Sequence, residues 1–202
     1  MAARLAVIYY SATGSVHALA NAVAAGAVDA GAEVRVRRVR ELAGEDAIDS
    51  DPAWRCFVDA TKYAVTEAAV DDLVWADAYA FGTPTRFGLP AAQLKQFLDQ
   101  TGSEWQAGVM AGKPVTTFTS SQNAHGGQES TILALNNVFY HWGSVIVPPG
   151  YTNPVLFPAG GNPYGVSSTS NDGPPSEAVL AAARYQGGLV TQVAQMLTAV
   201  TS

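Results

Sequence analysis

The 202 residues are 48% hydrophobic and 14% charged, a balance typical of a well-buried globular chain, and this length suits a single domain over 1–202. The net charge of −6 argues against nucleic acid or an anionic membrane surface as the main partner. The lone cysteine permits no internal disulfide, and we see neither a signal peptide nor an apolar run long enough to cross a bilayer, so we expect a cytoplasmic protein.

The N-terminal segment predicts a strand, a turn and a helix. Arg4–Tyr10 is apolar enough for a buried parallel strand, and apolar positions recur with helical spacing over Ser15–Ala30. The turn between them carries three hydroxyl side chains and one glycine. Such a turn aims free amide groups at the positive end of a helix dipole, which is a phosphate site that needs no lysine or arginine. An ordinary capped turn would use the same residue types.

The glycine pattern of this turn excludes two common nucleotide motifs. It holds neither G-x-G-x-x-G nor G-x-x-x-x-G-K-[ST], and no acidic residue follows the strand. Such an uncharged turn suits a dianionic monophosphate, and flavin mononucleotide (FMN) is the commonest ligand held in this way.

Glu33–Val39 predicts the second strand. It alternates valine with arginine, as an edge strand with one solvent-exposed face does.

The middle of the chain alternates in the same way. Residues 44–65 are acidic and irregular, and a helix over Glu67–Trp75, capped by Thr66, follows them. A strand over Ala78–Phe81 leads into a loop over Gly82–Pro90. The glycines and prolines of this loop offer backbone groups to a planar heterocycle, on which a phenylalanine can stack.

The C-terminal half completes five strands. The elements expected there are a helix over Ala91–Thr101, a strand over Pro114–Thr119, a polar loop over Ser120–Gln128, a helix over Glu129–Trp142, a strand over Ser144–Val147 and a helix over Ser176–Val200. The Gly- and Pro-rich segment 148–175 is too long for an ordinary connection and is either a functional lid or a disordered linker. Its aromatic residues Tyr151, Phe157 and Tyr164 favour an ordered surface loop. We therefore predict an α/β fold, a doubly wound five-stranded parallel sheet in the order 2-1-3-4-5 with helices on both faces.

Several sequence blocks carry a family resemblance. They are Tyr9-Tyr10-Ser11, Gly82-Thr83-Pro84-Thr85-Arg86-Phe87-Gly88, Phe97-Leu98-Asp99-Gln100-Thr101-Gly102, Gly126-Gly127-Gln128-Glu129, Val145-Ile146-Val147-Pro148, Pro163-Tyr164-Gly165 and Ala183-Arg184-Tyr185-Gln186-Gly187. These blocks occur in order over nearly the whole chain. The chain therefore resembles the WrbA family of flavodoxin-like, FMN-dependent NAD(P)H:quinone oxidoreductases.

The resemblance implies an activity and an assembly. It implies non-covalently bound FMN, NAD(P)H as a diffusible donor, two-electron reduction of quinones by a ping-pong reaction, and a homotetramer. The cofactor-binding residues that it implies are Ser11, Ala12, Thr13, Gly14, Ser15, Val16, Pro84, Thr85, Arg86, Phe87, Ser121, Gln122, Asn123, Ala124, His125, Gly126 and His141. Thr13 and Trp105 match substrate-binding positions, and His141 is the one candidate for a catalytic side chain.

The chain departs from the family pattern at two places. Thr13 stands where the family usually has an aromatic residue, and the loop from Ser121 to Glu129 has one more residue and fewer glycines than usual. We expect these departures to affect donor preference and turnover more than FMN binding. We interpret His17 as structural or solvated, and the three histidines have no metal-ligand spacing, so no metal is expected.

Alternative functions remain open from the sequence. A flavodoxin-type electron carrier without its own substrate turnover is compatible with the net charge. A flavin-dependent reductase of another electrophile, or a weakly flavinated binding module, is compatible with the altered loop from Ser121.

Overall fold

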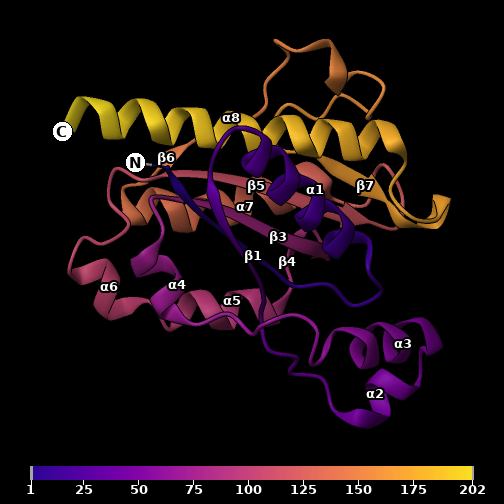
Figure 1. Cartoon of the computed structure of the whole chain (residues 1–202). Helices are drawn as coiled ribbons and strands as arrows, with labels where there is room; N and C mark the ends of the chain where they lie inside the picture. Colours follow the sequence, from indigo (N-terminus) through magenta and orange to yellow (C-terminus); the bar gives the residue numbers. More distant parts are fainter. Residues whose placement is uncertain (1, 202) are drawn as a thin grey trace.

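A parallel sheet crosses the middle of the molecule (Figure 1). The computed structural model describes residues 2–201, with side chains through residue 199. The strands of the main sheet, in spatial order, are β2 (Glu33–Arg38), β1 (Arg4–Tyr9), β3 (Ala78–Arg86), β5 (Pro114–Ser121) and β6 (Val145–Ile146). Every pairing along this path is parallel. The expected five-strand order is confirmed, because β5 and β6 are the fourth and fifth strands of that path.

Helices cover both faces of this sheet (Figure 1). On one face α1 (Ser15–Asp29) packs against α8 (Glu177–Thr201). On the other face lie α4 (Val70–Trp75), α5 (Ala92–Asp99) and α7 (Gln128–Trp142). Successive strand residues point to opposite faces, so Val7 joins the α1–α8 core while Ile8 joins the other. None of the helices formed by the described residues has the length and apolarity needed to cross a membrane.

Two glycines let α1 and α8 approach closely. A Cβ atom on Gly26 would lie 1.8 Å from the Arg184 carbonyl oxygen, and one on Gly187 would lie 1.9 Å from the Val23 oxygen. Only glycine fits where two helix backbones meet in this way. The Ala183-Arg184-Tyr185-Gln186-Gly187 block is therefore explained in part by helix packing.

The edge of β5 is shared by two short strands. Pro114 and Val115 pair with β6, whereas Thr119–Ser121 pair with β7 (Ser167–Thr169) after the long insertion. The gap between these pairings is filled by Gln186, whose side chain is fully buried. Its Nε2 donates to the Thr117 carbonyl and the Thr116 hydroxyl at 2.6 Å each, and its Oε1 accepts the Val166 amide at 2.8 Å. The side-chain amide of Gln186 thus makes the hydrogen bonds that a strand would otherwise make at this part of the β5 edge.

Several predicted elements were wrong in detail. Residues 44–65 contain two helices, α2 (Glu45–Asp49) and α3 (Pro52–Thr61), where the sequence suggested irregular structure. The helix expected over Glu67–Trp75 begins only at Val70, and the carboxylate of Asp72, not Thr66, accepts the Ala69 amide at its start.

The segments between the main strands and helices contain more regular structure than the sequence predicted. β3 extends to Arg86, into the loop expected at Gly82–Pro90, and pairs with β4 (Leu89–Pro90). A short helix, α6 (Gly102–Gln106), follows α5. Within segment 148–175 lie η1 (Pro154–Leu156), β7 and η2 (Ser170–Asp172), so this part is an ordered loop and not a disordered linker.

We predict that Gln186→Ala lowers the free energy of unfolding by about 2–4 kcal/mol, because it leaves the Val166 amide and the Thr117 carbonyl buried without partners. Denaturant unfolding followed by circular dichroism measures the change. Gln192→Ala on the exposed side of the same helix is the matched control, with an expected change within about 0.5 kcal/mol. Equal effects of the two changes would contradict this role for Gln186.

Candidate functional site

A cleft of about 640 Å³ lies at the carboxyl ends of β1, β3 and β5. Ligands of doubly wound sheets bind at this edge, and the volume lies within the roughly 300–1,000 Å³ of small-molecule sites. Its four walls are lined by residues from five parts of the chain: Ser11, Ala12, Thr13, Ser15 and Val16; Ser50, Asp51 and Trp54; Pro84, Thr85, Arg86 and Phe87; Ser120, Ser121, Gln122, Asn123 and Gly126; and Ser170, which lies against the fourth of these.

The first wall is the turn before α1. Gly14 has φ = +102°, and its amide donates to the Ser11 hydroxyl at 3.0 Å. Among the residues that the structure describes, none accepts a hydrogen bond from the backbone amides of Thr13, Ser15 or Val16. Free amides at the positive end of a helix dipole fit a phosphate dianion. This cradle therefore fits the phosphate of FMN without a cationic side chain.

The second wall is the hairpin that joins β3 to β4. Arg86 pairs with Leu89 across it, and the two turn residues, Phe87 and Gly88, have φ = +55° and +76°. Two central residues with positive φ define a type I′ turn, in which Asn, Asp or Gly are preferred to an aromatic residue. Phe87 is nevertheless fully exposed. An exposed ring held in a rarely adopted backbone conformation points to a ligand-binding role.

The hairpin rests on the N-terminus of α7. The Thr85 hydroxyl accepts the Gly88 amide at 3.2 Å and the Thr131 hydroxyl at 2.7 Å. A Cβ atom on Gly127 would lie 2.8 Å from the Gly88 Cα atom, so a side chain there would displace the turn. The Gly126-Gly127-Gln128-Glu129 block thus supports the loop that faces it.

The third wall is the loop after β5. The Ser121 hydroxyl donates to the Asn123 carbonyl at 2.6 Å and accepts the Gln128 Nε2 at 2.9 Å. Gln128 Oε1 accepts the Ser167 hydroxyl at 2.7 Å, which ties this loop to β7. The Ser170 hydroxyl in turn donates to the Ser121 carbonyl at 3.2 Å. The long insertion therefore helps to build the cleft.

The fourth wall, α3, is held against the end of β1 by the carboxylate of Glu41. Glu41 accepts the Trp54 indole N–H at 3.1 Å, the Tyr10 hydroxyl at 2.8 Å and the Gln93 amide at 2.8 Å. Burial acts to raise the pKa of Glu41, but hydrogen bonds from the backbone, Gln93 and Tyr10 outweigh it and hold that pKa below its usual value. An ionised Glu41 therefore joins the end of β1, α3 and α5 at the cleft.

The α3 wall was missed from the sequence. Ser50, Asp51 and Trp54 lie in the segment interpreted as irregular. The available signal was Asp51 followed by proline, because Asp at an N-cap and proline at the first helical position mark a helix start. Asp51 does cap α3, accepting the Ala53 amide at 2.9 Å.

Not every predicted site residue lines the cleft. Thirteen of them do, whereas Gly14, Ala124, His125, Trp105 and His141 do not. Trp105 and His141 lie together in a separate hollow between α5, α6 and α7, where the indole N–H donates to the His141 carbonyl at 2.7 Å. Within one copy of the chain these two side chains do not border the cleft.

His17 has protein partners. One ring nitrogen, Nδ1, is bonded to the Tyr9 hydroxyl, and the other, Nε2, lies 3.0 Å from the Asn21 amide. Burial lowers the pKa of His17, which favours a neutral imidazole. This placement agrees with a structural role. Among the described residues, no three His, Cys, Asp or Glu side chains are grouped so that they could hold a metal ion.

The topology and the cleft together define a flavodoxin-like α/β protein. The chain superposes with a TM-score of 0.70 on a flavodoxin, WrbA-like protein from Agrobacterium tumefaciens, with 25% identity over 96% of this chain and 99% of that one. Oxidised flavodoxin 2 from Bacillus cereus superposes with a TM-score of 0.61 at 14% identity, covering 94% of this chain and 99% of that one, a likeness of fold alone.

Sequence comparison narrows the class to a family. Residues 3–154 match the model of the NADPH-dependent FMN reductase family. A Deinococcus radiodurans protein named NAD(P)H dehydrogenase (quinone) is 45% identical over 91% of each chain. A Sinorhizobium fredii protein of the same name is 43% identical over 96% of this chain and 98% of its own. The chain belongs to the NADPH-dependent FMN reductase family, and its resemblance to the WrbA proteins is confirmed.

We predict that Phe87→Ala leaves the free energy of unfolding within about 0.5 kcal/mol of the wild type, since the ring is fully exposed. The same change should weaken FMN binding by about three- to tenfold through loss of ring stacking. Quenching of FMN fluorescence measures the affinity. Tyr63→Ala, which removes another exposed ring outside the cleft, is the control. Unchanged FMN affinity in the Phe87 variant would contradict the stacking role.

Proposed function

We propose that this chain is an FMN-dependent NAD(P)H:quinone oxidoreductase. The observation that carries the proposal is the meeting, in one cleft, of the free amides of the α1 turn and the aromatic hairpin of β3 and β4. One part suits a phosphate and the other a planar ring. The relatives named NAD(P)H dehydrogenase (quinone), which align with more than nine-tenths of the chain at 43–45% identity, support the same activity.

When bound, FMN supplies the two-electron chemistry of the reaction, which no side chain of the cleft provides. The amides of the α1 turn and the hydroxyls of Ser11, Thr13 and Ser15 hold the phosphate. The guanidinium of Arg86, which donates to the Thr85 carbonyl at 3.0 Å, adds positive charge at the hairpin end. Positive charge at this end favours a ligand that becomes anionic on reduction.

The two substrates use one place in turn. The cleft is a single space in which Trp54 and Phe87 present aromatic side chains. A nicotinamide and a quinone are both planar and suit the same aromatic environment. While the nicotinamide occupies this space the quinone cannot enter. The proposal therefore has a ping-pong order, in which the nicotinamide product leaves before the quinone binds. The proposal also places the protein in the cytoplasm, in keeping with its lone cysteine.

The FMN site is tested by placing a carboxylate in the phosphate cradle. Ser15→Asp should abolish flavin binding, because it sets a negative charge at the α1 amides. Ser176→Asp is the matched control: it makes the same change at an exposed cap of α8, outside the cleft. The wild type and the control should show visible flavin bands that bleach with NADPH under anaerobic conditions and return with benzoquinone.

The other outcomes are equally informative. Bound flavin that neither NADPH nor NADH reduces would overturn the enzymatic proposal and support the electron carrier. Failure of the wild type to bind FMN would overturn both.

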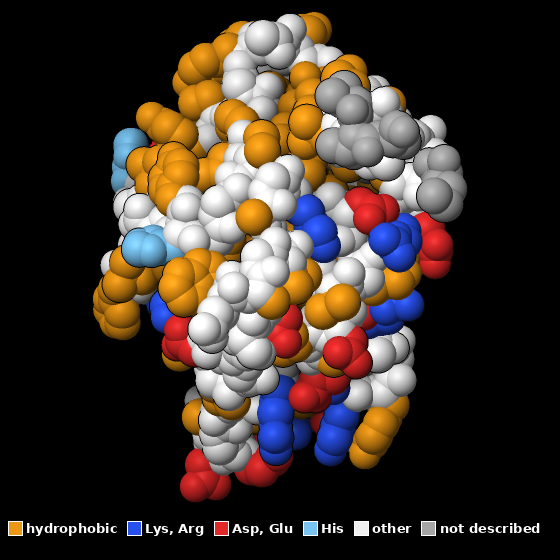
Figure 2. Space-filling view, turned by 90° about the vertical axis from the view of Figure 1, so that its left-hand side faces the viewer, with side chains coloured by type: hydrophobic (Ala, Val, Ile, Leu, Met, Phe, Trp, Pro, Cys, Tyr) orange, Lys and Arg blue, Asp and Glu red, His pale blue; other side chains and the backbone are white. Residues whose placement is uncertain are grey.

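The proposal also includes a homotetramer in which His141 serves the cleft of a neighbouring copy. Leu133 and Tyr140 on α7, and Trp105 beside them, are exposed. Figure 2 shows hydrophobic side chains gathered over the upper part of one side of the molecule and charged side chains gathered below. The insertion adds Tyr151 and Phe157, whose rings stack with centroids 6.1 Å apart while both remain exposed. Association of copies would cover such apolar surface.

Mixed oligomers test this arrangement. We predict that His141→Ala lowers kcat by about tenfold to a hundredfold through loss of a group that stabilises charge. Co-refolding it with the Ser15→Asp variant should restore part of the activity, because an intact cleft then meets an intact His141. Light scattering gives the mass of the assembly. A monomer, or mixtures no more active than their components, would contradict the shared site.

A further inference from the structure

The α1 turn is in contact with α3 on a side that does not border the cleft. A Cβ atom on Gly14 would lie 3.4 Å from Cδ2 and 3.8 Å from Cε2 of the Phe57 ring, which is ordinary van der Waals contact. Apart from the neighbours of Gly14 in the chain, no other residue that the structure describes has an atom within 4 Å of this position. The Phe57 ring therefore covers one side of the turn, and neither Gly14 nor Phe57 lines the cleft.

The same ring also contacts the first turn of α1. The Phe57 and His17 rings meet edge to face, with centroids 5.5 Å apart and an interplanar angle of 62°. His17 is itself held, because its Nδ1 is bonded to the hydroxyl of Tyr9 on β1. Phe57 thus rests on a part of α1 that is already fastened to the sheet.

These two contacts bracket the amides assigned to the phosphate. Gly14 precedes and His17 follows the pair Ser15 and Val16, whose backbone amides have no acceptor among the described residues. An amide without a partner keeps its direction only while the backbone on either side of it is held. The contacts with α3 therefore bear on how well these amides are aimed.

Gly14 is the residue of the turn that most needs such support. It has φ = +102°, and glycine has more conformational freedom than any other residue. The hydrogen bond from its amide to the Ser11 hydroxyl limits this freedom, and the packing of Phe57 limits it further. A turn ordered before the ligand arrives binds more tightly, because less order has to be created on binding.

The helix that carries Phe57 is anchored on both sides of it. Before Phe57, the Trp54 indole N–H donates to Glu41, as described above. After Phe57, the guanidinium of Arg38 on β2 donates to the Lys62 carbonyl at 2.9 Å. Phe57 lies between these anchors, so α3 is a fixed support for the turn.

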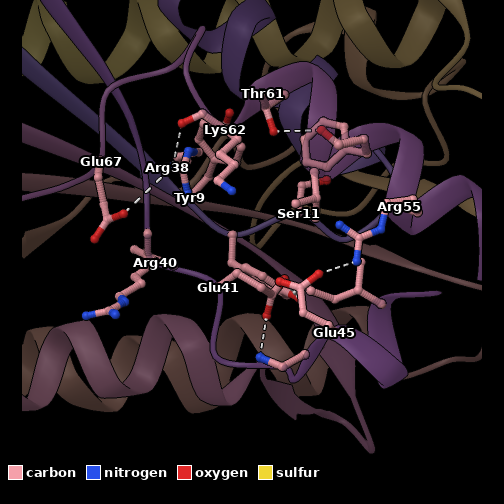
Figure 3. A pocket seen from close by; sticks show the side chains of 16 residues that line it. Tyr9, Ser11, Arg38, Arg40, Glu41, Glu45, Arg55, Thr61, Lys62 and Glu67 are labelled. Carbon is pink, nitrogen blue, oxygen red and sulfur yellow. Dashed lines mark hydrogen bonds and ion pairs between the residues drawn. The ribbon is translucent and has the colours of Figure 1, made fainter. Parts of the chain in front are cut away.

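Figure 3 shows α3 beside the start of the turn. Ser11 borders a hollow of about 240 Å³ together with Arg55, Thr61 and Lys62, and Phe57 lines the same hollow. Phe57 is half-buried and belongs to neither of the two cores that flank the sheet. Its position is therefore explained by the turn that it contacts rather than by core packing.

We propose that Phe57 is a positioning residue for the phosphate of FMN. By packing on Gly14 and His17 it fixes the α1 turn, and so it strengthens the preference for FMN over riboflavin, which has the same ring system but no phosphate. The inference rests on the proposed function, since it concerns the FMN site. Because Phe57 does not line the cleft, it acts on the phosphate only through the backbone of the turn.

The ratio of the dissociation constants of riboflavin and FMN tests this role. Quenching of flavin fluorescence gives both constants for the full chain freed of flavin, and the ratio should exceed one in the wild type. Phe57→Ala should lower the ratio by about fivefold to tenfold, because only FMN uses the amides of the turn. The affinity for riboflavin should stay unchanged. Phe57→Leu keeps most of the apolar volume and should retain most of the ratio.

Val58→Ala is the matched control. Val58 follows Phe57 on α3, is also half-buried and lines the same hollow, but it does not approach Gly14. Its truncation perturbs the same helix without touching the turn, so the ratio should stay within about twofold of the wild type. Circular dichroism should show that both variants are folded.

Phosphorus NMR gives an independent readout. In the wild type saturated with FMN, the bound phosphate should give one narrow resonance displaced from that of free FMN. In Phe57→Ala, also saturated, the resonance should be broader or lie nearer to that of free FMN, because a looser turn orders the phosphate less. An unchanged resonance would contradict the proposal.

The failures are distinguishable. Equal weakening of FMN and riboflavin binding in Phe57→Ala, an unchanged ratio, or an equal fall in Val58→Ala overturns the positioning role and leaves the proposed function intact. A wild type that binds FMN no more tightly than riboflavin overturns the phosphate site itself, and with it the FMN site of the proposed function.

Discussion

Parallel pairing of β1, β3 and β5 is the constraint on which the rest of this structure depends. Parallel strands deliver their carboxyl ends to one edge, so three loops that lie far apart in the sequence meet there. The amides at the start of α1 then face outward because no earlier turn of helix exists to accept them. The topology therefore places the walls of the cleft, and the side chains of the loops determine its shape and polarity.

The sheet and the cleft loops were the predictable parts of the molecule. Strands such as β1 and β3 are buried on both faces and have an apolar signal that no surface helix imitates. The turn at Ser11 to Ser15 follows β1, and Thr85, Arg86 and Phe87 lie at the end of β3, so their positions come with the fold. The positive φ of Phe87 was not predictable, because an aromatic residue is a poor signal for a type I′ turn.

The parts that escaped prediction are held by tertiary contacts rather than by local pattern. The helices α2 and α3 are short, and α3 is fixed through the bond from Trp54 to Glu41, thirteen residues earlier. Strand β7 has three residues and owes its place to Gln128 and Gln186, which bind it or its neighbour from other elements. Short segments of this kind have little periodicity of their own, so sequence reasoning sees only their polarity. His141 and Trp105 show the opposite limit, since the family match predicted them as site residues whereas the structure places them in a separate hollow.

The Glu41 carboxylate has a consequence for how this protein can diverge. It holds α3 against β1 and α5 through one half-buried acceptor, and Arg38 holds the end of α3 against β2. The hydrogen bonds that build the sheet itself run elsewhere. Segment 42–65 can therefore change in length and side chains without disturbing the sheet, as long as Glu41 and Arg38 keep their partners. Substitutions within this one segment, other than at Phe57, would reshape one wall of the cleft while the walls that follow β1, β3 and β5 stay in place.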